Sequence, residues 1–122
     1  MQHVSVMLDE CIEALNIDPA GIYVDATLGR AGHSCEILKR LESGWLYGFD
    51  IDRTALEESE PLLEAISGHY TLIHENFANL KSAMQEQGVD EVNGIFRREQ
   101  LRGDFGHHVE RGGNAVDAVL LY

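Results

Sequence analysis

Ten consecutive residues, from Asp25 to Ser34, have the composition of a ligand-binding loop. Their sequence is Asp-Ala-Thr-Leu-Gly-Arg-Ala-Gly-His-Ser. The small residues Gly29, Ala31 and Gly32 would let a ligand approach the backbone closely. Free amides at the start of a following helix would favour an anionic group. The stretch therefore predicts a loop that holds the anionic end of a ligand.

Asp50 follows Gly29 by 21 residues and stands at the end of a second apolar stretch. In open α/β sheets, a carboxylate at this place binds two ribose hydroxyls. The glycines at 29 and 32 fit neither a P-loop nor a clean G-x-G-x-x-G, which weakens a dinucleotide interpretation. S-adenosylmethionine, which has an adenosine and a carboxylate but no phosphate, fits the loop and the acid. The alternative, a tight turn at the glycines with Asp50 capping the next segment, stays open.

Alternating apolar and helix-like segments would position these residues. The predicted strands cover residues 22–24, 45–49, 69–74 and 92–96, and the predicted helices cover 9–15, 34–41, 54–66 and 80–87. We expect Thr54 to cap the third of these helices and Gly88 to end the fourth. Such alternation predicts an α/β fold, in which a parallel sheet carries helices on both faces.

The composition is that of an ordinary globular domain. The chain has 122 residues, of which 44% are hydrophobic and 25% are charged. We find no spanning segment and no secretory start, and two cysteines are too few for a disulfide framework, so we expect a cytoplasmic protein with no membrane association. The net charge of −12 repels phosphate, so any nucleic-acid role needs a basic surface from elsewhere. The spacing of histidines and cysteines does not suggest a metal site.

Several segments together resemble the bacterial small-subunit ribosomal RNA cytosine-N4 methyltransferase family (RsmH, also called MraW). The matching segments are residues 3–8, 21–34, 49–52, 74–77 and 92–95. The resemblance covers about residues 3–95. It implies a Rossmann-like class I methyltransferase core that uses S-adenosylmethionine to methylate N4 of a cytidine in small-subunit ribosomal RNA.

The resemblance also assigns site residues. Ala31, Gly32 and His33 match the family's cofactor loop, in which Gly-Gly-His is usual. Asp50 matches the ribose-binding acid, and Phe77 matches the residue that lines the adenine pocket. An aromatic side chain at that place would lie against the purine face. No residue of the chain is assigned a catalytic role.

The chain departs from the family pattern after Ile95. The family continues there with an apolar residue or two and then Asp-Leu-Gly-Val-Ser-Ser, whereas this sequence reads Phe-Arg-Arg-Glu-Gln from residue 96, and Arg98 stands where the acid belongs. We therefore predict a cofactor-binding half-domain over residues 1–95 and a non-matching, partly disordered tail over 96–122. We expect this chain to be truncated and impaired as an enzyme. A frame change, a natural truncation and a recombined gene fragment remain open as origins.

Two other functions stay open at this point. One is a non-catalytic fragment that binds the cofactor or a partner, because a sheet that ends at its fourth strand would expose an edge that invites self-association. The other is a fragment of a nicotinamide-dependent oxidoreductase, which the off-pattern glycines disfavour.

Overall fold

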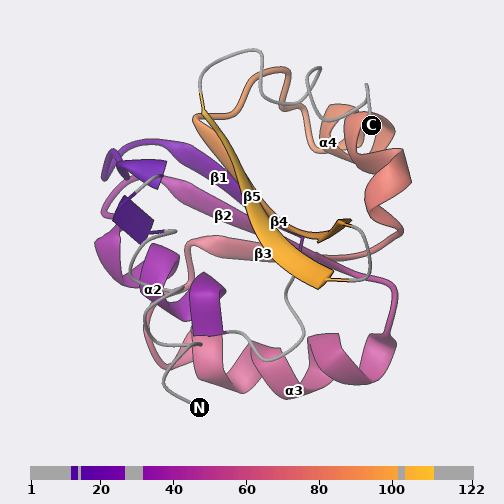
Figure 1. The fold of residues 1–122 in the computed structure, drawn as a ribbon. Helices are drawn as coiled ribbons and strands as arrows, with labels where there is room; N and C mark the ends of the chain where they lie inside the picture. Colours follow the sequence, from indigo (N-terminus) through magenta and orange to yellow (C-terminus); the bar gives the residue numbers. More distant parts are fainter. Residues whose placement is uncertain (1–11, 14, 27–31, 102–103, 112–122) are drawn as a thin grey trace.

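The computed structural model describes residues 12–13, 15–26, 32–101 and 104–111. Its five-stranded sheet has the order β3-β2-β1-β4-β5, and β3, β2, β1 and β4 run parallel (Figure 1). The strands are β1 (Ile22–Asp25), β2 (Trp45–Asp50), β3 (Tyr70–His74), β4 (Gly94–Leu101) and β5 (Asp104–Arg111). The predicted parallel sheet with helices is confirmed.

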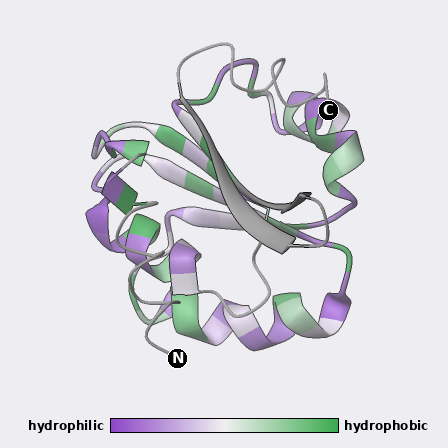
Figure 2. Cartoon of the chain, viewed as in Figure 1, coloured by the Kyte–Doolittle hydropathy of each residue, from purple (hydrophilic) through white to green (hydrophobic). Residues whose placement is uncertain are grey.

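Helices cover both faces of this sheet (Figure 1). Helices α2 (Gly32–Arg40) and α3 (Arg53–Glu64) pack on one face, where Tyr23 joins their apolar side chains. The 3₁₀ helix η2 (Phe77–Asn79) and α4 (Leu80–Glu86) pack on the other face, over Val24. Successive β1 side chains thus enter opposite apolar layers, as the pleat of a strand requires. Figure 2 shows hydrophobic residues in the central strands and both kinds of residue along the helices.

The ends of α3 and α4 test two predicted helix signals. Helix α3 begins at Arg53, and its N-cap is Asp52, whose carboxylate accepts a hydrogen bond from the Thr54 backbone N–H at 2.9 Å. The prediction that Thr54 caps this helix is therefore wrong, because a carboxylate two residues earlier satisfies the free amide. Gly88 follows α4 with a φ of 76°, which confirms it as the residue that ends this helix.

The fourth strand runs past its predicted end at residue 96. It continues to Leu101 and pairs with the antiparallel strand β5, with Phe96 opposite Val109 and Leu101 opposite Asp104. This hairpin is not among the elements predicted from the sequence. Its backbone pairing covers the β4 edge that was expected to be exposed. The predicted boundary at residue 95 falls within β4, and the division into two parts stays a prediction.

Candidate functional site

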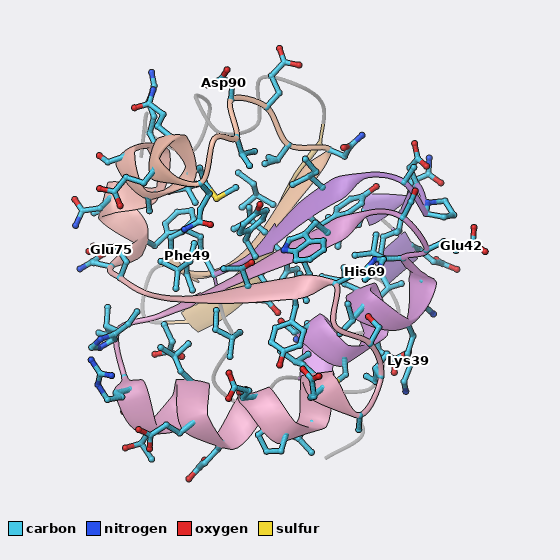
Figure 3. All side chains as sticks on the ribbon, turned by 180° about the vertical axis from the view of Figure 1, so that it is seen from behind. Lys39, Glu42, Phe49, His69, Glu75 and Asp90 are labelled. Atoms are coloured by element: carbon cyan, nitrogen blue, oxygen red, sulfur yellow. The ribbon has the colours of Figure 1, made fainter. Side chains whose placement is uncertain are left out.

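A pocket of about 230 Å³ opens at the carboxyl ends of β1, β2 and β3. Its lining consists of Ala26, Phe49, Asp50, Ile51, Glu75, Asn76 and Phe77. Figure 3 shows Phe49 and Glu75 at this end of the sheet and His69 at the opposite end. Ligands of open α/β sheets bind outside the carboxyl ends of the strands, so the pocket lies where this fold places a ligand.

Asp50 is the last residue of β2, and its backbone and side chain shape the wall of the pocket. Its carboxylate Oδ1 accepts a hydrogen bond from the Asp52 N–H at 2.8 Å. Its backbone carbonyl accepts another from the Glu75 N–H at 3.1 Å, which joins the segments that follow β2 and β3. The half-buried Asp50 carboxylate is thereby held at the pocket by the turn that starts α3.

Two apolar side chains face the same pocket. Ile51 is 68% exposed, which is unusual for an isoleucine. Phe77 is half-buried and packs against the apolar cluster between α4 and the sheet. A flat aromatic base is bound well by apolar side chains of this kind, with the aromatic ring adding stacking. The pocket thus combines a carboxylate with apolar contact surface.

A second carboxylate, Glu75, stands on the rim. Its Oε1 accepts hydrogen bonds from the Asn79 side-chain amide at 2.8 Å and from the Asn76 N–H at 3.0 Å. The bond from Asn79, followed by that from Asn76, holds the pKa of Glu75 below its ordinary value. Asn76 in turn caps η2 by accepting a hydrogen bond from the Ala78 N–H at 2.9 Å. The rim is therefore acidic and well ordered by hydrogen bonds.

A buried polar pair joins β1 to α2. Asp25 and Ser34 are both 0% exposed, and the Ser34 hydroxyl donates to the Asp25 carboxylate at 2.6 Å. The bond ties the end of the strand to the first turn of the helix. It thereby fixes the distance between the two described ends of the predicted glycine loop.

The predicted site residues fall into three groups. Asp50 and Phe77 lie together in the pocket. Gly32 is the exposed first residue of α2, and His33 stacks on Phe96 with ring centroids 4.2 Å apart, so neither belongs to the pocket lining. Gly29 and Ala31 lie outside the described residues.

Sequence reasoning gave no site role to four of the lining residues, which are Phe49, Ile51, Glu75 and Asn76, and it included Ala26 only as part of the predicted loop. Ile51 follows the predicted ribose-binding acid, and Glu75 and Asn76 follow the third strand as Asp50 ends the second. These residues could have been predicted from the rule that the carboxyl ends of neighbouring parallel strands meet at one edge of the sheet.

The described part of the chain contains no group of three histidine, cysteine or acidic side chains placed to hold a metal ion. None of the helices in that same part is long and apolar enough to cross a bilayer.

Comparison with known proteins decides the family. The model of the MraW methylase family matches residues 1–97. The chain belongs to the MraW methylase family. It is 52% identical over 97 residues to ribosomal RNA small subunit methyltransferase H of Limosilactobacillus fermentum, and 49% identical over 94 residues to the protein of that name in Mesoplasma florum. These alignments cover 76% and 77% of this chain.

The chain spans 30% of the length of each of these two MraW-family relatives. Among solved structures, TrmN from Thermus thermophilus has a TM-score of 0.61 at 17% identity, with 75% of this chain and 27% of that chain covered. At that identity, the likeness shows the fold, a class I Rossmann-like methyltransferase architecture.

Proposed function

We propose that this chain is the S-adenosylmethionine-binding part of a methyltransferase that acts on N4 of a cytidine in small-subunit ribosomal RNA. The observation that carries the proposal is the pocket formed by Asp50, Ile51 and Phe77 in a chain of the MraW methylase family. The substrate class is inferred from the names of the relatives given above, and the cofactor is inferred from the residues that line the pocket.

The pocket fits the adenosine part of this cofactor. Its volume of about 230 Å³ is below the roughly 300–1,000 Å³ of sites that enclose a whole small molecule, which suits a nucleoside alone. The Asp50 carboxylate would accept hydrogen bonds from the ribose hydroxyls, while Ile51 and Phe77 would contact the base.

The predicted loop would hold the methionine part. Bound S-adenosylmethionine supplies a methyl group on a cationic sulfonium. A side chain added at Gly32 would meet none of the described atoms within 4 Å, so none of the described residues fills the space beside this glycine at the start of α2. We assign Gly29, Ala31, Gly32 and His33 to this part of the site as a prediction.

The RNA contacts of this activity would lie elsewhere. With a net charge of −12, this chain repels the RNA backbone, and the family match ends at residue 97. We therefore propose that the chain alone binds cofactor in the cytoplasm but transfers methyl groups poorly. Its non-catalytic alternative, a cofactor-binding fragment that associates with a partner or a second copy, is favoured by the same early end of the match. The comparisons give no support to a nicotinamide-dependent oxidoreductase.

Calorimetric titration with S-adenosylmethionine tests the proposal, with NAD as the control ligand. We expect saturable binding of S-adenosylmethionine alone. Asp50→Ala removes a charged acceptor for two hydroxyls, and we expect about ten- to hundredfold weaker binding. Asp90→Ala, which removes an exposed carboxylate in the loop before β4, should leave the affinity unchanged.

Two results would contradict the proposal. One is a folded chain that binds neither ligand. The other is binding that Asp50→Ala and Asp90→Ala affect equally, because the pocket would then not be the site of the ribose.

A further inference from the structure

His74, the last residue of β3, bridges this strand to the segment that follows β2. Its Nε2 lies 2.9 Å from the Ile51 carbonyl oxygen, and its Nδ1 lies 3.3 Å from Nη2 of Arg53. A carbonyl only accepts and a guanidinium only donates, so Nε2 carries the proton and Nδ1 accepts. The two contacts together specify one neutral tautomer of the ring.

The bridge holds the one pocket residue whose apolar side chain stays largely in solvent. Ile51 is 68% exposed and lines the pocket, while His74 does not belong to the pocket lining. The neighbouring Asp50 and Asp52 side chains fix the turn by accepting from the Asp52 and Thr54 amides. The bond from His74 is the contact that fastens the Ile51 carbonyl itself to the adjacent strand.

We propose that His74 is a positioning residue for the cofactor, which acts by holding Ile51 over the adenosine pocket. The inference rests on the proposed function. A wall that is ordered before binding lowers the entropy that the ligand must overcome, so the bridge would strengthen affinity without a contact to the ligand. Arg53 would support the bridge by favouring the tautomer that donates to Ile51.

The same strand provides a matched control at its opposite end. His69 immediately precedes β3, and its Nδ1 lies 3.2 Å from the Gly44 carbonyl oxygen. Its ring stacks on Trp45 with centroids 5.3 Å apart. Figure 3 places His69 at the end of the sheet away from Phe49 and Glu75. It therefore makes the same kind of bond to a backbone carbonyl, far from the pocket.

The test is calorimetric titration of the wild-type chain and its variants with S-adenosylhomocysteine. We expect His74→Ala to weaken binding about three- to tenfold, the effect of one lost hydrogen bond on the ordering of the wall. His69→Ala should keep the wild-type affinity. His74→Gln places an amide N–H near the position of Nε2 and should restore most of the affinity, whereas the shorter His74→Asn should not.

Amide hydrogen exchange in the ligand-free protein gives a second readout that is independent of ligand binding. We expect the Asp52 amide to exchange faster in His74→Ala than in the wild type, and His74→Gln to restore its protection. A merely structural role for His74 would lower stability and affinity in parallel and would not distinguish glutamine from asparagine.

Three results would overturn the inference. The first is wild-type affinity in His74→Ala, and the second is an equal loss in His69→Ala. The third is a wild-type chain that does not bind S-adenosylhomocysteine, which contradicts the proposed function as well. The first two results leave the proposed function standing, so a failure of the inference about His74 can be distinguished from a failure of the proposed function.

Discussion

Ser34 and Asp25 form the buried polar pair that joins the end of β1 to the first turn of α2. Both residues are 0% exposed, and the hydroxyl is 2.6 Å from the carboxylate. Ser34→Ala would leave a buried carboxylate without this donor, so we expect it to lower the free energy of unfolding by about 1–3 kcal/mol. Urea denaturation measures this loss. Ser82→Ala, on the exposed face of α4, should change it by less than about 0.5 kcal/mol. Equal stability of the two variants would contradict the role of the pair.

The environment of Glu75 makes the stability of the folded chain depend on pH in a direction that can be predicted. Hydrogen bonds from Asn79 and Asn76 lower its pKa below 4.5 in the folded chain. The stabilisation that the ionised Glu75 gives the folded chain is therefore fully present above the pKa that this group has in the unfolded chain. It is lost as the pH falls through the lower pKa of the folded chain. Carboxyl NMR titration should show the pKa of Glu75 rising toward 4.5 in Asn79→Ala. An unchanged titration in that variant would mean that Asn79 does not hold the carboxylate.

Sequence reasoning predicted only some of the residues that line the candidate pocket. The spacing from the glycine loop identified Asp50, and the family resemblance identified Phe77. Ile51 was not found, because an isoleucine after a strand is expected to be buried, and its 68% exposure depends on the turn that surrounds it. The roles of Glu75 and Asn76 depend on hydrogen bonds within the segment 75–79, which residue type alone does not specify.

The starts of β1 and β2 are joined through Gly44. Its N–H donates to the Pro19 carbonyl at 2.9 Å, and the next residue, Trp45, donates to the Gly21 carbonyl at 3.0 Å. A methyl group on Gly44 would overlap that same Gly21 carbonyl oxygen, which is rigid backbone. The starts of β1 and β2 can thus lie this close together only because Gly44 has no side chain.

Gly44→Ala should therefore destabilise the fold by about 1–3 kcal/mol. The matched control is Gly68→Ala, because a methyl group there would meet none of the described atoms within 4 Å. Differential scanning calorimetry compares the two variants. If the Gly44→Ala and Gly68→Ala variants have the same melting temperature, the close approach of the two strands is not needed for stability.

At the scale of elements, alternation of apolar and amphipathic segments predicted the four parallel strands well. Buried strands such as β1 and β2 depend on apolar side chains, which a sequence displays directly. Strand β5 was missed because an edge strand is held chiefly by backbone pairing with β4, and its sequence lacks a clear period. The cap of α3 was placed two residues late, because two potential capping residues, Asp52 and Thr54, lie only two positions apart in the sequence.

For the molecule as a whole, we expect cofactor binding and methyl transfer to be separable. The pocket lies within the family match, whereas the chain spans 30% of the length of the two relatives. We expect this chain alone to transfer labelled methyl from S-adenosylmethionine to unmodified small ribosomal subunits far more slowly than a longer relative does, under conditions in which it binds the cofactor. Transfer at a rate comparable to that of a longer relative assayed in parallel would refute this separation.

Intermolecular NMR contacts would show directly where the adenosine binds. In a complex with S-adenosylhomocysteine, we expect nuclear Overhauser effects from the adenine and ribose protons to the Ile51 methyl groups and the Phe77 ring. These two side chains line the pocket beside Asp50. Contacts confined instead to the larger hollow lined by Ile12, Ile17 and Arg40 would contradict this placement of the adenosine, because that hollow has a different set of lining residues.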